Sequence, residues 1–395
     1  MRLLLNGMPA LGAYTGVGYY AWHLLDQLSR RPEVEELGVF AGWEVLPWPR
    51  FATRVLDTES AGPLGGVGLR QMLRALVPPA RRAYGRMRAR AFRRAVGDGR
   101  WSLYHEPNYI PLPFTGPVVV TVHDLSFRRT PQFLPSDRLA WLKESMSAAL
   151  ARADLVVTNS EFTRRELVEL YPDLKPERVR AIHLGVDERF SAAPDAVTEE
   201  GGAGASDTLI ADLGLPPRFL LFVGTLEPRK NLQGLLKAHA ALPPALQREY
   251  PLVVTGGRGW RQRYFWKDLE LLRLRGTVRT LGYVPHALVP ALMRAATALC
   301  YPSHYEGFGL CPLQAAACGT AVVAADIPPL RETLDDAALF ADPRAPESIA
   351  AQLRRMIEDE PLRQSLREAA RQRAAQFTWP RCAERTLAVY RELLG

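Results

Sequence analysis

Short hydrophobic runs alternate along the chain with longer stretches in which hydrophobic residues recur every three or four positions. Runs of four or five such residues have the length of buried strands, whereas the longer stretches have the periodicity of helices that bury one face. Val118–Val122 is the clearest run, because its β-branched residues are typical of a strand buried on both faces of a parallel sheet. The alternation predicts an α/β fold.

The first half of the chain is predicted to form one sheet with helices between its strands. A glycine-rich turn follows the first strand, and Asn159 or Ser160 precedes the last helix in a capping position. We expect strands at 2–6, 37–41, 102–105, 118–122 and 155–158, and helices at 19–29, 137–152 and 161–170.

The second half repeats this alternation after a small, polar segment at 191–213, which we interpret as a linker or loop. Two Rossmann-like halves of this kind predict a ligand cleft at their interface. We expect strands at 219–223, 252–255, 278–281, 298–301 and 321–324, and helices at 231–241, 266–273, 347–358, 361–376 and 381–394.

The composition fits a protein of two or three domains without disulfide bonds. Hydrophobic residues make up 47% of the 395 positions, and no run of 18 apolar residues is present. The four cysteines form no CxxC pair, and the N-terminal hydrophobic stretch is too short and too broken for a signal peptide. We therefore expect a cytoplasmic protein.

The positive charge is concentrated in one segment. Residues 70–100 hold ten arginines and one acid, so this segment has a net charge of +9, against +8 for the whole chain. Hydrophobic residues lie between the arginines with helical spacing, which predicts binding to an anionic surface on the inner face of the membrane, at roughly 1 kcal/mol per arginine. An ordinary solvated helix face is the alternative. Nucleic acid is not expected, because few aromatic residues interleave the charges.

Two cations follow the strand predicted at 219–223. Arg229 and Lys230 lie directly before a helix that is expected to begin near Asn231. Free backbone N–H groups and the positive end of the helix dipole would join these charges in a site for a diphosphate. The pattern is not a P-loop, and a solvated basic turn is the alternative if the motif is taken alone.

A carboxylate and a glycine-flanked turn follow the strand predicted at 298–301. Glu306 precedes Gly307-Phe308-Gly309, whose glycines allow backbone amides to approach a ligand closely. Glu306 could accept hydrogen bonds from sugar hydroxyls or balance a developing oxocarbenium ion. A helix is expected at 312–318, ended by Gly319 in the left-handed conformation. A simple tight turn is the alternative, and the cations one α/β unit earlier argue against it.

Polar residues also follow two strands of the first half. His123 and Asp124 end the run at 118–122, where α/β folds place ligands, so His123 is predicted to bind a sugar hydroxyl or to move a proton. His105, Glu106 and Asn108 lie at and just beyond the end of an earlier strand and are candidates for the same cleft. For both histidines, a place in the packed core is the alternative.

Together the motifs GTLEPRKN, GYVP and YEGFGL–PLQAAACGT and the His-Asp pair resemble family 4 of the retaining glycosyltransferases with the GT-B fold. The sequence is most similar to the bacterial mannosyltransferase-like branch, over nearly the whole chain. The resemblance implies two Rossmann-like domains that face each other across a cleft. It implies an N-terminal acceptor domain at 1–190, a linker at 191–214, a donor nucleotide-sugar domain at 215–376 and a helix at 377–395 that packs back on the N-terminal domain.

The resemblance also implies roles for single residues. His123, Glu306, Arg229 and Lys230 are implied as catalytic, with the two cations stabilising the departing diphosphate. The implied donor-binding residues are Gly16, Gly224, Thr225, Arg229, Lys230, Tyr283, Val284, Glu306, Gly307, Phe308, Gly309, Leu310 and Gln314. The candidates on the acceptor side are Tyr14, His105, Glu106, Asn108 and Asp124.

Gln314 departs from the family pattern, in which a second glutamate usually binds the ribose hydroxyls of the donor. An amide also binds hydroxyls, but its neutral hydrogen bond is weaker by about 1 kcal/mol. We therefore expect a donor affinity that is about fivefold lower. Thr225 is a second departure, because some members have an arginine at this place.

These features predict a retaining glycosyltransferase that uses a nucleotide-diphosphate sugar. GDP-mannose is the leading donor, and a glycan or lipid-linked molecule of cell-surface polysaccharide or lipopolysaccharide synthesis is the expected acceptor. No Asp-x-Asp sequence is present, so we expect neither a metal ion nor a cofactor. A non-catalytic, sugar-nucleotide-binding partner subunit is the alternative that Gln314 suggests.

Overall fold

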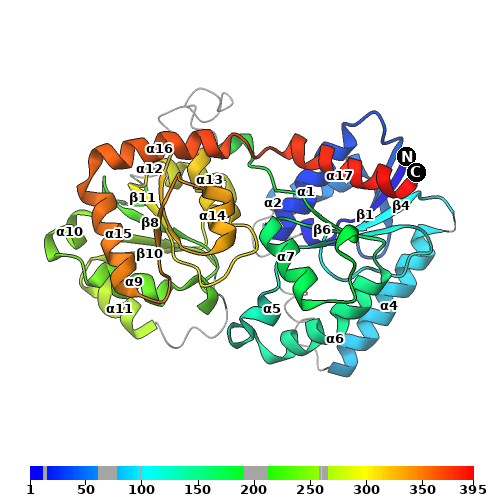
Figure 1. Ribbon diagram of the computed structural model, residues 1–395, viewed down its shortest axis with the longest axis horizontal. Helices are drawn as coiled ribbons and strands as arrows, with labels where there is room; N and C mark the ends of the chain where they lie inside the picture. Colours follow the sequence, from blue (N-terminus) through cyan, green and yellow to red (C-terminus); the bar gives the residue numbers. More distant parts are fainter. Residues whose placement is uncertain (12–15, 61–77, 98, 191–211, 258, 260–265) are drawn as a thin grey trace. The chain divides into compact units, whose positions relative to one another are not determined.

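The computed structural model describes the chain except for residues 12–15, 61–77, 98, 191–211, 258 and 260–265. Its contacts divide the chain into two compact units (Figure 1). Unit 1 comprises Met1–Leu125, Ala140–Gly185 and Trp379–Gly395, and unit 2 comprises Ser126–Leu139 and Val186–Thr378. Each unit contains its own largely parallel sheet with helices, which confirms the predicted α/β class.

Unit 1 is built on a seven-stranded sheet in the order β3-β2-β1-β4-β5-β6-β7. Neighbouring strands run parallel except β2 and β3, which form an antiparallel hairpin at one edge. All five residues of β5 are buried, as the hydrophobic run predicted. The strands are β1 (Arg2–Asn6), β2 (Glu36–Phe40), β3 (Val45–Pro47), β4 (Leu103–Glu106), β5 (Val118–Val122), β6 (Leu155–Thr158) and β7 (Val179–Ala181).

Unit 2 is built on a six-stranded parallel sheet in the order β10-β9-β8-β11-β12-β13. The strand order reverses between β8 and β11, as it does in doubly wound nucleotide-binding folds. The strands are β8 (Leu220–Val223), β9 (Leu252–Thr255), β10 (Val278–Gly282), β11 (Ala298–Tyr301), β12 (Ala321–Ala325) and β13 (Leu339–Ala341).

Helices connect most successive strands, apart from β2–β3 and β4–β5, and in unit 2 they cover both faces of the sheet (Figure 1). Helices α9, α11 and α15 lie on one face, and α12, α13 and α14 lie on the other. The helices are α1 (Gly16–Ser29), α2 (Trp48–Ser60), α4 (Pro78–Val96), α5 (Ser126–Arg129), α6 (Ser136–Arg152), α7 (Glu161–Leu170), α9 (Leu232–Ala240), α10 (Pro244–Glu249), α11 (Trp266–Leu274), α12 (Val289–Ala295), α13 (Leu310–Ala317), α14 (Pro328–Leu334), α15 (Pro346–Glu358), α16 (Glu360–Ala374) and α17 (Trp379–Leu394).

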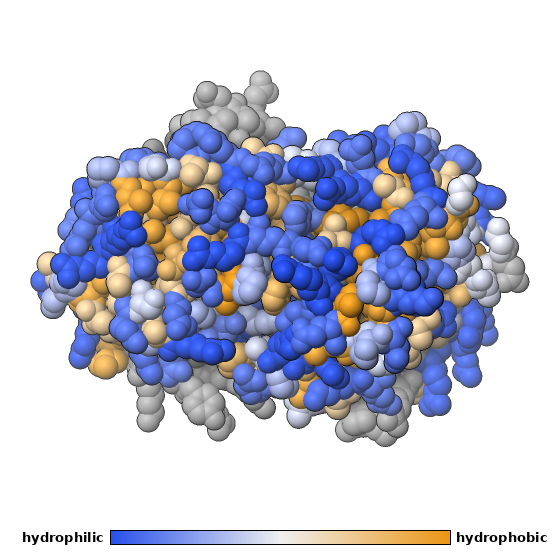
Figure 2. Space-filling view, in the orientation of Figure 1, coloured by the Kyte–Doolittle hydropathy of each residue, from blue (hydrophilic) through white to orange (hydrophobic). Residues whose placement is uncertain are grey.

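The sheet of unit 2 lies against a continuous hydrophobic core. Leu220, Val254 and Ala298 from three strands pack with Leu235 of α9 and Leu353 of α15, and all five side chains are almost fully excluded from water. Burial of a leucine or valine side chain contributes roughly 1.5–3 kcal/mol. Hydrophilic residues cover much of the visible surface of both units (Figure 2).

The C-terminal helix α17 packs on α1 within unit 1. Trp379 stacks on His23, with their ring centroids 4.7 Å apart and their planes inclined by 6°. Near the other end of α17, the Tyr390 hydroxyl lies 2.5 Å from Nδ1 of the fully buried His105. The last helix of the chain is therefore part of the core of unit 1, together with elements from the start of the chain.

The division into units differs from the predicted domain boundaries at two segments. Residues 126–139 belong to unit 2, where the Phe133 ring stacks on His304 with centroids 5.4 Å apart. Residues 186–190 belong to unit 2 as well. Such contacts between distant parts of the chain leave no trace in local periodicity. Most of the predicted linker, 191–211, lies outside the described residues.

Most predicted strands and helices lie within two residues of their observed bounds. The cap of α7 is Ser160, whose Oγ accepts a 3.0 Å hydrogen bond from the backbone N–H of Thr163. The elements that the prediction omitted are mostly short and include β3, β7, β13, α5, α10, α12 and α14. A few residues provide too little periodicity for assignment, so packing against the rest of the unit decides their conformation.

Candidate functional site

The strand order of unit 2 identifies where a ligand would bind. In doubly wound folds, ligands bind beyond the carboxyl ends of the strands at the point where the order reverses, which is here between β8 and β11. The segment after β8 carries the predicted cations, and the segment after β11 carries the predicted carboxylate. The topology thus brings together Lys230 and Glu306, which are 76 positions apart in the sequence.

A close backbone approach shapes the segment after β8. A Cβ atom on Gly256, which follows β9, would lie 1.8 Å from the carbonyl oxygen of Gly224. Only glycine at 256 therefore allows the ends of β8 and β9 to lie so close. The chain then forms a short 3-10 helix, η6 (Pro228–Lys230), which holds both cations.

The helix that follows the cations differs from the expectation of free N–H groups. Helix α9 begins at Leu232, and Asn231 caps it by accepting a 3.2 Å hydrogen bond from the N–H of Gly234. Asn231 is left-handed, with φ of 56°, and its side-chain amide donates to the carbonyls of Pro302 and Pro343 at 3.0 and 2.7 Å. The side chain of Asn231 therefore occupies the backbone N–H of Gly234, which was expected to be free for a diphosphate. It also connects the segment after β8 with the segment after β11 through the carbonyl of Pro302.

The segment after β11 enters α13 through Gly309. This residue has φ of 93°, and a Cβ atom on it would lie 2.3 Å from Cδ2 of Leu330, so the turn requires glycine. Gly309 is the N-cap of α13, and no side chain caps this helix. First-turn N–H groups of a helix are the groups that bind anions. Gly319, just beyond α13, has φ of 70°, which confirms the predicted left-handed end.

Glu306 lies between the two cations. Nζ of Lys230 is 2.7 Å from its Oε1, and Nη1 of Arg229 is 3.1 Å from its Oε2. Arg229 also donates through Nε and Nη2 to Oε1 of Glu227, at 3.0 and 2.6 Å, and through Nη1 to the carbonyl of Tyr305 at 2.6 Å. The structure therefore brings three predicted site residues into direct contact and adds a second carboxylate to them.

This cluster keeps Glu306 ionised. The residue is 7% exposed, and burial alone would raise the pKa of its carboxyl. The charges of Lys230 and Arg229 outweigh burial and lower the pKa of Glu306 to about 2. Lys230 also donates a hydrogen bond to the hydroxyl of Tyr301 and lies 4.8 Å from the centre of its ring. The carboxylate of Glu306 and the two cations are thus held in contact beyond the ends of β8 and β11.

The other predicted donor residues of unit 2 differ in their access to a ligand. Phe308 is buried, so its side chain belongs to the core and only its backbone could meet a ligand. Gln314 on α13 and Val284 are also buried. Thr225 is exposed, and Tyr283 is 51% exposed, so both side chains are accessible.

In unit 1, three neighbours hold His123 after β5. Its Nε2 lies 2.8 Å from the carbonyl oxygen of Pro107, which can only accept, so Nε2 carries the proton. The rings of Tyr20 and Tyr109 meet the imidazole edge to face at centroid distances of 5.1 and 6.3 Å. Burial lowers the pKa of His123, so the ring is neutral at neutral pH and its Nδ1 is an acceptor.

His105 is not an acceptor-site residue, contrary to the prediction. It is fully buried, with Nδ1 2.5 Å from the hydroxyl of Tyr390 and Nε2 2.7 Å from Oγ1 of Thr121. Burial lowers the pKa of His105 to about 3. Both ring nitrogens are used inside the core, so the alternative of a packed core histidine is correct here.

Glu106 also lies in the interior, which corrects its predicted role. Its Oε2 accepts hydrogen bonds from Tyr104 and Asn6 at 2.7 and 2.8 Å, and its Oε1 accepts from the backbone N–H of Asn108 at 3.1 Å. Burial raises the pKa of Glu106 to about 7. Of the remaining acceptor candidates, Asn108 is exposed and Asp124 is half-buried.

Two candidates lie near the start of α1. Tyr14 falls outside the described residues. Gly16 begins α1 and is exposed, and a Cβ atom on it would meet no atom within 4 Å. Packing therefore does not require glycine at 16. Among the residues that the structure describes, no group of three or more His, Cys, Asp or Glu side chains could hold a metal ion.

Two residues of the cluster were absent from the sequence-based prediction. Glu227 pairs with Arg229, and an acid two positions before an arginine in one turn was a usable signal for this. Tyr301 ends β11, and nothing in a strand pattern indicates that its hydroxyl accepts from Lys230. Both side chains contact the cations, Glu227 contacting Arg229 and Tyr301 contacting Lys230, so a search for ligand-binding residues alone would not find them.

The ionised state of Glu306 makes the stability of unit 2 depend on pH. Its pKa of about 2 lies below the ordinary value of 4.5, so the carboxylate stabilises the fold above pH 4.5 and this contribution is lost as the pH falls toward 2. The shift corresponds to roughly 3 kcal/mol. We expect urea unfolding of the wild type to lose stability more steeply below pH 4.5 than that of Glu306→Gln. Parallel pH profiles would contradict this assignment.

Two family models match the chain. The Glycosyltransferase Family 4 model matches residues 14–190, and the Glycosyl transferases group 1 model matches residues 207–373. The O-antigen chain mannosyltransferase B of Escherichia coli is 32% identical over 395 residues, which cover 100% of both chains. The D-inositol 3-phosphate glycosyltransferase of Salinispora arenicola is 33% identical over 297 residues, which cover 71% of this chain and 64% of that one.

Solved structures show the same fold. HepE of Anabaena in complex with UDP and glucose superposes with a TM-score of 0.69 at 18% identity, over 100% of both chains. WaaG, a glycosyltransferase involved in lipopolysaccharide biosynthesis, gives a TM-score of 0.70 at 16% identity, over 98% of this chain and 99% of that chain. These low identities show the fold alone. The full-length relative and the two family models show that the chain belongs to glycosyltransferase family 4, as a mannosyltransferase-like glycosyltransferase, and the solved structures show that its fold is GT-B.

Proposed function

We propose that the protein transfers mannose from GDP-mannose, with retention of configuration, to a glycan or lipid-linked acceptor during synthesis of a cell-surface polysaccharide. The observation that carries this proposal is the contact of Glu306 with Arg229 and Lys230 where the strand order of unit 2 reverses. The choice of mannose is supported by the full-length match to an O-antigen chain mannosyltransferase.

The cations suit the most difficult step of the reaction. When the sugar leaves the nucleoside diphosphate, negative charge develops on the departing oxygen. The side chains of Arg229 and Lys230 are only 15% and 12% exposed, so they would act on that charge through a medium less polarisable than water. Preorganised donors in such a place lower a barrier by several kcal/mol. The uncapped N-terminus of α13 would add backbone N–H groups.

Glu306 in unit 2 and His123 in unit 1 each have a side chain whose chemistry would suit a sugar hydroxyl. An ionised Glu306 would stabilise the positive charge that the reacting carbon acquires, or accept hydrogen bonds from sugar hydroxyls. His123 has a neutral ring whose proton is on Nε2, so its Nδ1 could accept a hydrogen bond from a hydroxyl. Gln314 lies buried on α13, where we assign it to the ribose of the donor.

The helix α4 supports a second part of the proposal, docking of this cytoplasmic enzyme on an anionic membrane surface. The helix contains no acidic residue, and Arg86, Arg90, Arg93 and Arg94 are exposed on it. Its Tyr84 ring meets the half-exposed Trp43 at 6.2 Å. Exposed cations beside an exposed tryptophan are typical of surfaces that bind the membrane interface. No helix of the described residues is both long and apolar enough to cross a bilayer.

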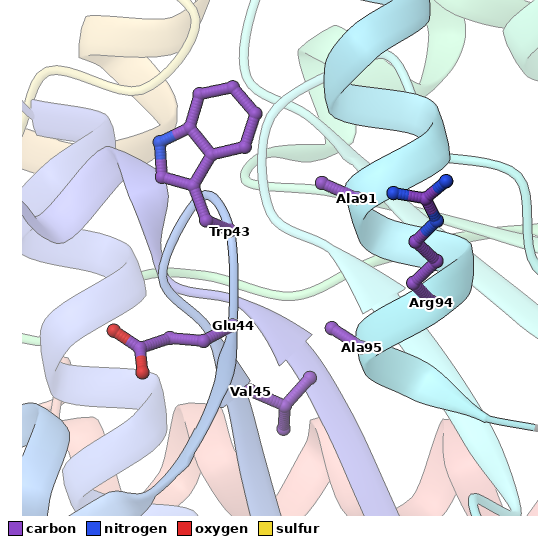
Figure 3. A pocket seen from close by; sticks show the side chains of 6 residues that line it. All are labelled: Trp43, Glu44, Val45, Ala91, Arg94 and Ala95. Carbon is purple, nitrogen blue, oxygen red and sulfur yellow. The ribbon is translucent and has the colours of Figure 1, made fainter.

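A shallow groove lies on the same surface (Figure 3). It has a volume of about 490 Å³ and is formed by the turn between β2 and β3 on one side and by α4 on the other. Its lining residues are Trp43, Glu44, Val45, Ala91, Arg94 and Ala95. The arginine on one side of this groove and the tryptophan on the other would suit a phosphate headgroup and the apolar region next to it.

The donor is tested by a thermal-shift screen of wild-type protein with GDP-, UDP- and ADP-sugars. A ligand that binds only the folded state raises the melting temperature by mass action. We expect the largest rise with GDP-mannose. A rise with a UDP- or ADP-sugar and none with GDP-mannose would contradict the choice of donor but not the site.

The role of Glu306 is tested by Glu306→Gln, which keeps the size of the side chain and removes its charge. We expect transfer from the donor to fall by about 100-fold or more, because a preorganised charge at the reacting centre is lost. Glu249→Gln is the matched control, since it removes a carboxylate from an exposed ion pair of the same unit. Equal turnover by wild type and Glu306→Gln would refute the site.

Membrane docking is tested by cosedimentation with vesicles that contain phosphatidylglycerol. Each arginine contributes roughly 1 kcal/mol near an anionic surface, so Arg90→Glu with Arg94→Glu should weaken binding by more than about tenfold. Arg248→Glu with Arg275→Glu makes the same charge change on exposed residues of unit 2 and should bind like the wild type. Equal binding of the two double variants would exclude α4 as the docking surface.

A further inference from the structure

We infer that Glu227 is a positioning residue of the donor site, which orients the guanidinium of Arg229 and offsets its charge so that the nucleoside diphosphate product can leave. The inference rests on the proposed function, because it concerns the same diphosphate site. Glu227 itself is 6% exposed and touches Arg229, so its effect on a ligand passes through that arginine.

The geometry of the pair fixes the guanidinium plane. Nε and Nη2 of Arg229 both donate to Oε1 of Glu227, at 3.0 and 2.6 Å. A guanidinium is planar and rigid, so holding this edge aims the remaining edge. That edge carries Nη1, which meets the carbonyl of Tyr305 at 2.6 Å and the carboxylate of Glu306 at 3.1 Å. The orientation of Arg229 toward Glu306 therefore depends on Glu227.

Backbone contacts hold Glu227 in turn. Its N–H donates to the carbonyl of Thr225 at 2.8 Å, and its own carbonyl accepts from the N–H of Lys230 at 3.0 Å. Gly259 packs against this turn so closely that a Cβ atom on it would lie 2.3 Å from the Leu226 carbonyl oxygen. The carboxylate is thus attached to a part of the chain that has little room to move, as positioning requires.

The charges of the cluster balance. Glu227 and Glu306 each carry one negative charge, and Arg229 and Lys230 each carry one positive charge, so the four side chains sum to zero. Without the charge of Glu227 the cluster would be positive by one, and a diphosphate would bind more tightly, because charges interact strongly in a partly buried site. Tight product binding slows turnover wherever product release limits the rate.

The substitution Glu227→Gln separates charge from shape. Its amide oxygen can still accept the hydrogen bonds of Arg229, but the negative charge is gone. We expect titration calorimetry to show that GDP binds Glu227→Gln about tenfold more tightly than the wild type. We also expect kcat and the KM for GDP-mannose to fall together. Glu249→Gln, which removes a charge from an exposed pair with Arg218, should match the wild type.

The substitution Glu227→Asp provides the complementary test. It keeps the charge but shortens the side chain, so GDP affinity should stay within about twofold of the wild type while kcat falls by about tenfold or more. Melting temperatures without ligand show whether each variant is folded. If Glu227→Gln does not fold, Glu227→Asp alone decides the matter, and unchanged kcat in it would overturn the positioning role.

The outcomes distinguish this inference from the proposed function. Unchanged or weaker GDP binding by folded Glu227→Gln, in a wild type that binds GDP, overturns the charge offset and leaves the proposed function intact. If wild-type protein binds none of GDP, UDP and ADP better than inorganic phosphate, the proposed donor site fails, and the inference fails with it.

Discussion

The contact of Glu306 with Lys230 and Arg229 is the interaction on which the proposed donor site depends. Removing a charge from water costs several kcal/mol, and only close opposite charges offset that cost in a protein interior. Here the four charged side chains compensate one another at distances between 2.6 and 3.1 Å. Each of the four side chains is therefore stable in this buried position because the opposite charges of the others are close to it.

The sheet of unit 2 makes this assembly possible. Parallel strands place their carboxyl ends on one edge, so the segments after β8 and β11 leave the sheet side by side. Asn231 then ties these segments through the carbonyl of Pro302, and glycine at 256 permits a backbone approach that any side chain would block. Gly309 provides the left-handed residue at the start of α13. The hydrophobic core holds the strands in place, and the segments that follow β8 and β11 therefore hold Lys230 and Glu306 close together.

The class of fold could be predicted from the sequence, and so could the two cations and the carboxylate that the structure brings into one cluster. Hydrophobic periodicity reports burial directly, and charged residues after a buried strand point to the edge where ligands bind. The same reasoning failed for His105 and Glu106, because β4 ends one residue later than predicted and both residues belong to its fully buried part. In the sequence, a histidine one residue after a strand, such as His123, looks like a histidine inside the strand, such as His105, because both follow a hydrophobic run.

Long-range contacts could not be predicted in the same way. Nothing local indicates that Tyr390 on the last helix meets His105, or that Phe133 stacks on His304. The ion pair of Glu227 with Arg229 is local, but its importance follows only from the orientation that it gives to Nη1. Such contacts depend on three-dimensional packing, which a one-dimensional pattern does not contain.

The most direct measurement is a crystal structure of the protein with GDP bound. We expect the diphosphate to lie within hydrogen-bonding distance of Lys230 and Arg229, beyond the ends of β8 and β11. GDP bound elsewhere, with Lys230 and Arg229 still paired only to carboxylates, would contradict the central claim that this cluster is the donor site.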